Sequence, residues 1–229
     1  PSLRYCKNIV KGGTPSRCRQ GLVSVATICL SRMAGPYGDA AIAAMSIVTR
    51  ITQFANSIVI GFGQGFQPVC GFNYGAKLYA RVREGFWFCV KLATCILLAA
   101  AVLGWLLSEN LIAIFLHNDP LVIEYGSMAL RLQCITFPLV GWITISNMML
   151  KTGVRTLKAS LLAMSWQFLF FVAAVLVLPN FLGMFGVQLG QPIADVFSFL
   201  LAVPLALSEL RDMNRLEEQL RIAPQADEM

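Results

Sequence analysis

The stretch GFGQGFQPVCGFNYGAKLYARVRE, residues 61–84, lies between two long apolar segments and indicates how the chain folds. Its glycines and Pro68 weaken a helix, because glycine is flexible and proline lacks an N–H donor. The sequence Asn-Tyr-Gly at 73–75 is typical of a tight turn. Three basic residues follow it closely: Lys77, Arg81 and Arg83. A broken helix end followed by a basic turn is typical of the cytoplasmic face of a membrane protein.

The composition of the chain fits a membrane protein better than a soluble one. Of its 229 residues, 57% are hydrophobic and 13% are charged, and the mean hydropathy is +0.67. A soluble domain carries about 25% charged residues. The net charge of +6 could indicate a nucleic-acid partner. Because the basic residues lie between apolar runs, we interpret them as loop charges on the inner side of a bilayer and expect no nucleic acid.

Six apolar segments are long enough to cross a bilayer, which takes about 20 mostly apolar residues in a helix. We therefore predict an all-α, polytopic membrane protein built as a six-transmembrane-helix bundle. The second segment is longer than a bilayer needs, so we expect a bend or an unwound turn near Gly61–Gly65. A short amphipathic piece is expected in the loop after the third segment. The predicted spans are 17–34, 40–69, 86–107, 122–150, 158–178 and 184–207.

The basic residues indicate the orientation of these spans. If residues 1–16 lie inside, all but three of the 18 Lys and Arg residues fall at inner loops. The exceptions are Arg32, near an outer end, and Arg50 and Arg131, which lie within predicted spans. By the positive-inside rule, we expect a multi-pass protein of the cell membrane with both termini in the cytoplasm.

The seven cysteines and the single histidine form no motif for a metal or a disulfide. No two cysteines make a CxxC, and most lie in or beside apolar segments, so we expect free thiols. His117 stands alone in a loop. The chain has no HExxH motif, no GxSxG motif and no pair of acids within the spans, which argues against a membrane-embedded enzyme. We expect no metal and no organic cofactor.

Several motifs resemble those of multidrug and toxic compound extrusion (MATE) transporters. The pattern G-x-G-Q-G-x-Q-P, followed by G-F-N-Y-G-A-K and R-V-R, is similar to a signature between two helices of that family. Further similarities follow in the order expected of the family's C-terminal half: R-Q-G-L at 19–22, Y-G-D at 37–39, A-A-M-S-I at 43–47 and Q-P-I-A-D at 191–195.

Members of the family have twelve helices in two six-helix lobes. The resemblance therefore implies that this chain is the C-terminal lobe, helices seven to twelve, and that its partner, the N-terminal lobe, is missing. Residues 1–16 would end a cytoplasmic linker, 17–208 would form the lobe, and 209–229 would be a cytoplasmic tail. The apolar residues of the tail share one helical face, so the tail lies on the membrane surface or continues the last helix. A start at Pro1 rather than Met is expected of a fragment.

Ionisable residues inside a span are rare, because each costs about 2.5–3.5 kcal/mol at the helix centre on insertion scales. Three stand out here because they lie well inside their spans: Arg50, Arg131 and Asp195. At a rise of 1.5 Å per residue, they lie about 15, 10 and 16 Å from the outer ends of their spans. We hypothesise that Asp195 faces the lobe interior and pairs with Arg50 or Arg131. Such a pair either fixes two helices together or reorganises during transport.

Amide side chains extend the candidate site. Gln53 and Asn56 are three residues apart and share a helical face. Amides in a membrane also join neighbouring helices, so this alternative stays open. Our candidate cavity-lining residues are Arg50, Gln53, Asn56, Arg131 and Asp195. Our candidate residues for gating or helix breaks are Gly61, Gly65, Gln67, Pro68 and Pro192.

The resemblance implies cation-coupled antiport, in which H⁺ or Na⁺ flows inward and amphipathic, often cationic, organic compounds and drugs leave. One branch of the family has coupling carboxylates in the first helices of this lobe. Here the first span has no acid and the second has none after Asp39, so we expect the coupling residue in the missing lobe. The alternatives are a flippase or exporter of a lipid-linked substrate, which would suit Arg50 and Arg131, and an inactive truncated fragment.

Overall fold

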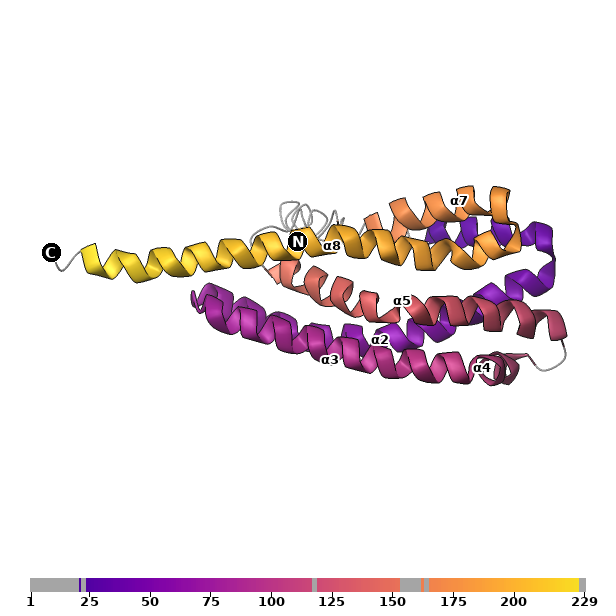
Figure 1. The fold of residues 1–229 in the computed structure, drawn as a ribbon, viewed down its shortest axis with the longest axis horizontal. Helices are drawn as coiled ribbons and strands as arrows, with labels where there is room; N and C mark the ends of the chain where they lie inside the picture. The colour runs from indigo at the N-terminus through magenta and orange to yellow at the C-terminus, as the bar shows by residue number, and fades with distance from the viewer. Residues whose placement is uncertain (1–20, 22–23, 117–118, 153–161, 163–164, 227–229) are drawn as a thin grey trace, which may run out of the picture.

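The computed structural model of the chain describes residues 21, 24–116, 119–152, 162 and 165–226. Within these ranges the chain is helical and contains no β-strand. Its helices run roughly side by side in an elongated bundle (Figure 1). The predicted all-α fold is thus confirmed. The expected linker and the beginnings of the first and fifth predicted spans lie outside the described residues.

Four long helices make up most of the bundle, and shorter helical pieces connect them. The long helices are α2 (Asp39–Gly75), α3 (Tyr79–Leu106), α5 (Pro120–Thr152) and α8 (Met184–Ala226). Before α2, residues 24–34 are helical and lead into the 3₁₀ turn η1 (Gly35–Tyr37). The remaining pieces are α4 (Ser108–Phe115), the π-helical turn η2 (Ser165–Phe170) and α7 (Phe171–Leu182).

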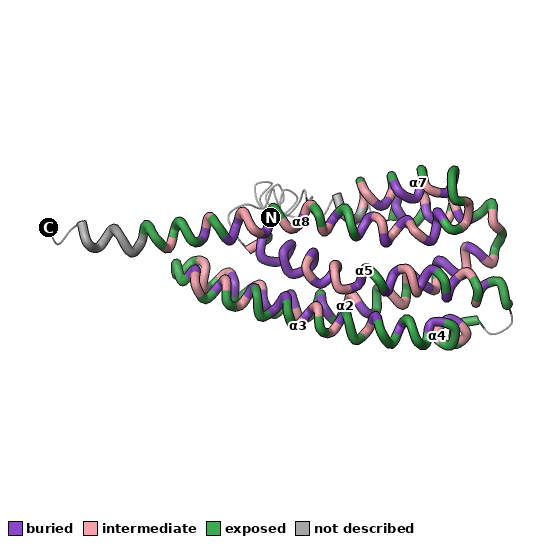
Figure 2. Tube along the Cα trace, in the orientation of Figure 1, coloured by how far each residue is buried: buried purple, intermediate pink, exposed green. Residues whose placement is uncertain are grey.

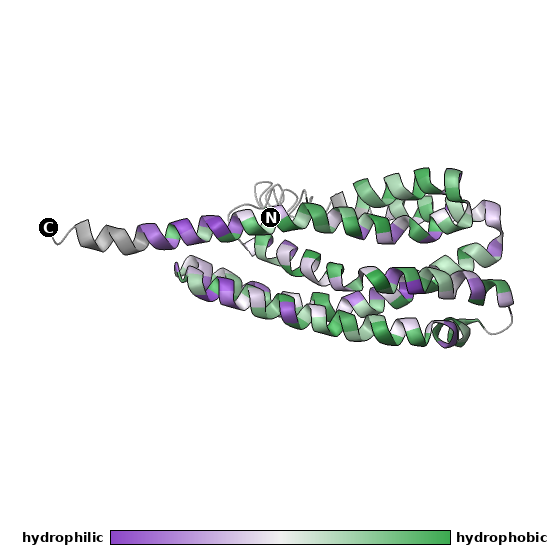
Figure 3. Ribbon diagram, in the orientation of Figure 1, coloured by the Kyte–Doolittle hydropathy of each residue, from purple (hydrophilic) through white to green (hydrophobic). Residues whose placement is uncertain are grey.

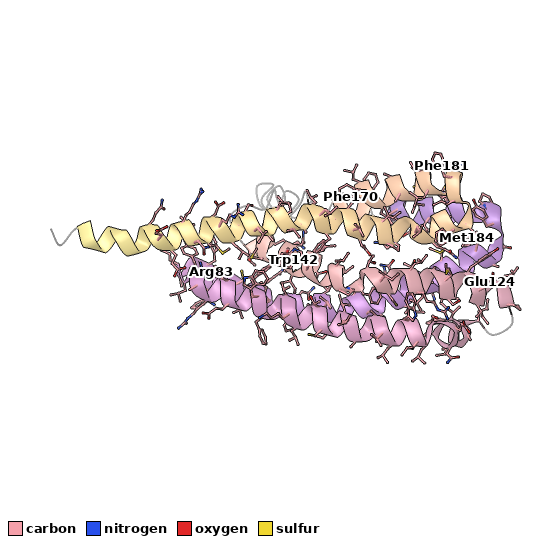
Figure 4. The ribbon with its side chains drawn as sticks, in the orientation of Figure 1. Arg83, Glu124, Trp142, Phe170, Phe181 and Met184 are labelled. Carbon is pink, nitrogen blue, oxygen red and sulfur yellow. The ribbon has the colours of Figure 1, made fainter. Side chains whose placement is uncertain are left out.

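By length and composition, α2, α3, α5 and α8 can each cross a bilayer. A shorter apolar helix, Phe168–Leu182, contains α7. With the helical residues 24–34, these elements correspond in order to the six predicted spans, of which the first and fifth are described only in part. Many large apolar side chains on the outside are exposed, such as Phe181 of α7 at 83% (Figure 4). Lipid tails would cover such a surface in a bilayer.

Helix α5 is the centre of the bundle, because it packs against α2, α3 and α8. Its C-terminal half is almost continuously buried (Figure 2). Trp142 of α5 joins three helices: its ring lies 5.6 Å from that of Phe86 on α3 and 6.3 Å from that of Phe199 on α8, between centroids. Such edge-to-face contacts are favourable beyond the area they bury.

Glycines allow α7 and α8 to approach each other closely. A Cβ on Gly186 would lie 2.5 Å from the carbonyl carbon of Leu178, and one on Gly190 would lie 2.5 Å from Cγ2 of Val175. These two glycines are four residues apart on α8, which is the small-xxx-small spacing of closely packed membrane helices. Because any larger residue would push the helices apart, the two glycines determine the α7–α8 contact.

Helix α2 passes through the glycine-rich stretch without interruption, so of the bend or unwound turn predicted near Gly61–Gly65, the unwound turn is wrong. Pro68 also lies inside the helix, as proline can in membrane helices when other groups satisfy the freed backbone. The helix ends at Gly75, and the turn follows at Lys77, whose φ is 59°. There the N–H of Leu78 donates to the carbonyl of Asn73 at 2.9 Å, which closes the helix end.

Helix α8 continues well past the rest of the bundle at its C-terminal end (Figure 1). Hydrophilic residues gather in this extension, whereas α7 is almost entirely hydrophobic (Figure 3). The extension packs near the start of α3: Met213 is 1% exposed, and Arg83 pairs with Glu217 at 3.2 Å (Figure 4). Of the two expectations for the tail, continuation of the last helix is therefore correct.

Candidate functional site

A buried polar cluster surrounds Asp195, which is fully buried on α8. Its Oδ2 accepts hydrogen bonds from Nε2 of Gln133 at 2.7 Å and from Oγ1 of Thr136 at 2.9 Å. Its Oδ1 accepts one from Nε2 of Gln191 at 3.0 Å. Gln133 and Thr136 are three residues apart and share a face of α5. The cluster therefore links α5 to α8 inside the lobe, as expected of a carboxylate that faces the interior.

Arg131, however, has other partners than Asp195. Its Nη2 lies 2.9 Å from Oε1 of Glu109, and its Nε donates to Oγ of Ser108 at 2.8 Å. Both partners belong to α4, which Figure 1 shows nearly end-on, so this short helix crosses the end of the bundle. The long arginine side chain reaches toward the bundle end, where water can solvate its charge.

The expected ion pair of Asp195 with Arg50 or Arg131 is therefore wrong. Among the described residues, ion pairs join Arg131 to Glu109 and Arg83 to Glu217. Arg50 lies on an exposed side of α2, whereas Asp195 is enclosed. Neutral amide and hydroxyl donors take the place that we assigned to an arginine. Neither Gln133 nor Thr136 is among the candidate site residues named from the sequence; the signal that could have found them is two polar residues three positions apart within a predicted span.

An exposed row of residues runs along α2 opposite its buried side. Its members are three or four residues apart, which places them on one helical face. We call this row the polar stripe; it consists of Ser46, Arg50, Gln53, Ser57, Gly61, Gln64 and Pro68, all exposed. Within the described structure, the side chains of Arg50, Gln53 and Gln64 make no hydrogen bond or ion pair. Lipid cannot solvate such groups at membrane depth, so the polar stripe requires water, ligand or protein.

The remaining candidates lie beside this stripe or away from it. Asn56 is half-buried, and its buried Oδ1 has no hydrogen-bond partner in the described structure. Gln67 points toward α5, where its Nε2 lies 2.6 Å from Sδ of Met148. Pro192 is buried within an uninterrupted α8. The predicted cavity residues thus divide into an exposed group on α2, an enclosed cluster at Asp195 and the end-of-bundle pair of Arg131. The cavity-lining role of these residues, and the gating role of Gln67, Pro192 and the other gating candidates, stay predictions.

No metal centre accompanies these groups in the described part of the chain, where no three His, Cys, Asp or Glu side chains are placed to hold an ion. The described cysteines are free: Cys29, Cys70, Cys89, Cys95 and Cys134. The polar groups available for chemistry are mostly amides, hydroxyls and one exposed guanidinium on α2. Such groups can bind and orient a ligand by hydrogen bonds and charge.

The sequence model of the MatE family matches residues 15–175. The chain belongs to the MatE family. Two curated members of similar sequence are multidrug export proteins called MepA. The protein of Staphylococcus saprophyticus is 24% identical over 212 residues, which are 93% of this chain and 46% of MepA. The protein of Staphylococcus haemolyticus is 22% identical over 208 residues, which are 91% of this chain and 45% of that protein.

Solved MATE structures share the fold. An inward-facing multidrug resistance MATE transporter aligns with a TM-score of 0.86 and 20% identity, over 94% of this chain and 50% of that chain. The Vibrio cholerae MATE transporter VcmN in its bent form gives a TM-score of 0.82 at 18% identity, over 93% of this chain and 49% of that chain. The fold is thus that of one MATE lobe, and the chain spans about half the length of these relatives. The predictions of a MATE-type membrane fold and of a transporter family, not an enzyme family, are confirmed.

Proposed function

We propose that the chain is the C-terminal lobe of an exporter that moves amphipathic organic compounds and drugs out of the cell. Inward flow of H⁺ or Na⁺ would drive the export. The match of the MatE family to residues 15–175 is the observation that carries this proposal, and the one-lobe fold supports it. Transport would proceed by rocking of this lobe against the N-terminal lobe, with the substrate between them.

Within the lobe, one group of described residues holds helices together and another faces the cavity. The cluster of Asp195, Gln133 and Thr136 ties α5 to α8, so that these helices move as one body. The polar stripe of α2 then faces the other lobe across the cavity. The coupling ion would bind to a carboxylate of the N-terminal lobe, in line with the absence of acids from α2 after Asp39.

The arrangement in the membrane belongs to the same proposal. We infer a location in the cell membrane with both termini in the cytoplasm, because the basic residues gather at one set of loops. The division into a linker at 1–16, a lobe at 17–208 and a tail at 209–229 belongs to this proposal, and the described part of the tail, up to Ala226, continues α8.

An efflux assay tests the proposal. The full-length transporter that contains this chain and the chain alone are each placed in vesicles, and export of an amphipathic fluorescent dye is followed under a pH gradient and under a Na⁺ gradient. We expect gradient-driven export from the full-length protein and none from the chain alone. Export that ignores both gradients would refute coupling. Absence of export by the full-length protein would favour an inactive product.

A further inference from the structure

The polar stripe of α2 carries one charge, and that charge is positive. After Asp39 at its first position, Arg50 is the only Lys, Arg, Asp or Glu residue of α2. The rest of the stripe consists of amides, hydroxyls, a glycine and a proline. The opposite side of the helix is buried and apolar, with residues such as Val48, Ala55 and Val59 packed into the core. After Asp39, the polar stripe thus offers hydrogen-bond donors and no carboxylate.

The depth of Arg50 makes its exposure informative. The residue lies ten positions from Ala40, about 15 Å into a hydrocarbon core of about 30 Å. A guanidinium at that depth is costly in lipid, and no described residue of this lobe neutralises it. Its planar fork of N–H donors matches the oxygens of a carboxylate or phosphate. An anionic group in the cavity would therefore compensate this charge.

Side chains near Arg50 could also contact a ligand whose anionic group binds the guanidinium. Gln53 follows one turn after Arg50 on the same face and supplies an amide donor. Beside the stripe, Phe54 and Ile58 are 74% and 49% exposed and offer an apolar surface. One end of this surface can thus hold an anion, while the adjacent flank can contact an apolar body. This combination suits an amphipathic molecule with a negatively charged group.

We propose that the polar stripe binds the anionic group of an amphipathic organic compound, with Arg50 as its counter-charge and Gln53 as an additional donor. Phe54 and Ile58 contact the apolar body of the compound. This inference rests on the proposed function, because it places the stripe at the cavity between the lobes. It narrows the substrates to compounds that carry a carboxylate or similar oxyanion, in contrast to purely cationic drugs.

Equilibrium binding to the purified full-length transporter tests this inference separately from transport. The probes are one fluorescent aromatic dye with a free carboxylate and its methyl ester, measured in phosphatidylcholine nanodiscs. We expect the wild-type protein to bind the carboxylate form more tightly. Arg50→Gln should weaken that binding at least about tenfold and leave the ester unchanged. Arg50→Lys should retain most of the preference. Arg32→Gln is the matched control, because Arg32 is also exposed but lies outside the stripe.

Three results would overturn the inference. Equal binding of both dyes by the wild-type protein would show that the charge is not recognised. Equal losses for both dyes in Arg50→Gln would indicate that Arg50 contacts the N-terminal lobe instead. Displacement of the carboxylate dye by phosphatidylglycerol would assign the stripe to a lipid headgroup. Loss of dye export without a change in this binding preference would count against the proposed function alone.

Discussion

Oδ2 of Asp195 on α8 accepts a 2.7 Å hydrogen bond from Nε2 of Gln133 on α5, inside the lobe. In membranes such bonds between helices contribute about 0.6 kcal/mol on average, but an unsatisfied buried donor costs more. We expect Asp195→Ala to lower the free energy of unfolding by about 2–4 kcal/mol, since it strands several donors. Asp195→Asn should cost less, because the carboxamide keeps an oxygen for Gln133. Thermal unfolding in detergent measures both, and an equal effect of the two variants would contradict this account.

Substitution of glycine by alanine should destabilise the lobe at some positions and stabilise it at others. Gly186→Ala and Gly190→Ala should destabilise the α7–α8 contact, because a Cβ would lie 2.5 Å from atoms of α7. Gly61→Ala and Gly65→Ala should stabilise the helix by up to about 1 kcal/mol, since nothing lies within 4 Å of either Cβ. Unfolding temperatures report both groups. If Gly65→Ala lowers export without lowering stability, the predicted gating role is supported; unchanged export would remove it.

The extension of α8 should be held by packing more than by charge. Met213 is 1% exposed, so Met213→Ala should lower the free energy of unfolding by about 2 kcal/mol or more. Leu216→Ala is the matched control at 37% exposure and should change it by less than about 0.5 kcal/mol. Glu217→Gln removes the partly exposed pair with Arg83 and should cost at most about 1 kcal/mol. A larger effect of Glu217→Gln than of Met213→Ala would refute this order.

The orientation in the membrane can be tested with single cysteines and a membrane-impermeant thiol reagent. Lys77→Cys and Lys151→Cys should react only from the cytoplasmic side, because the proposed topology places both at the inner ends of their helices. Glu109→Cys on α4 should react only from outside. A finding that Lys77→Cys and Lys151→Cys react from opposite sides would rule out the proposed topology.

The sequence predicted the helical fold well because its signals were long apolar runs and one-sided basic loops. The four long helices begin and end within about eight residues of the predicted spans, apart from the C-terminal end of α8. Of the bend or unwound turn expected near Gly61–Gly65, the unwound turn is wrong. Gly61 and Gly65 lie on the exposed face of α2 with nothing within 4 Å of an added Cβ, while Gly63 is buried against Met148, and the helix stays whole through all three.

The site was harder to predict because it depends on which helices touch. The distances from the outer ends of the spans placed Asp195 at about the same membrane depth as Arg50. Depth alone does not show how each helix is rotated about its axis, and that rotation decides which side chains face one another. The partners came from α5 through Gln133 and Thr136, while Arg131 turned toward Glu109 on α4. Exposure of Arg50 and Gln53 on one face of α2 likewise follows from the packing of the opposite face.

The most direct test of the central claim is the water accessibility of the polar stripe in the full-length transporter. Single cysteines are introduced in a background without native cysteines, and their reaction with a water-soluble maleimide is timed in membranes. Gln53→Cys should react rapidly, whereas Val59→Cys in the core and Phe88→Cys on the apolar surface of α3 should not. If Gln53→Cys reacts as slowly as Phe88→Cys, the stripe does not line an aqueous cavity and the account is contradicted.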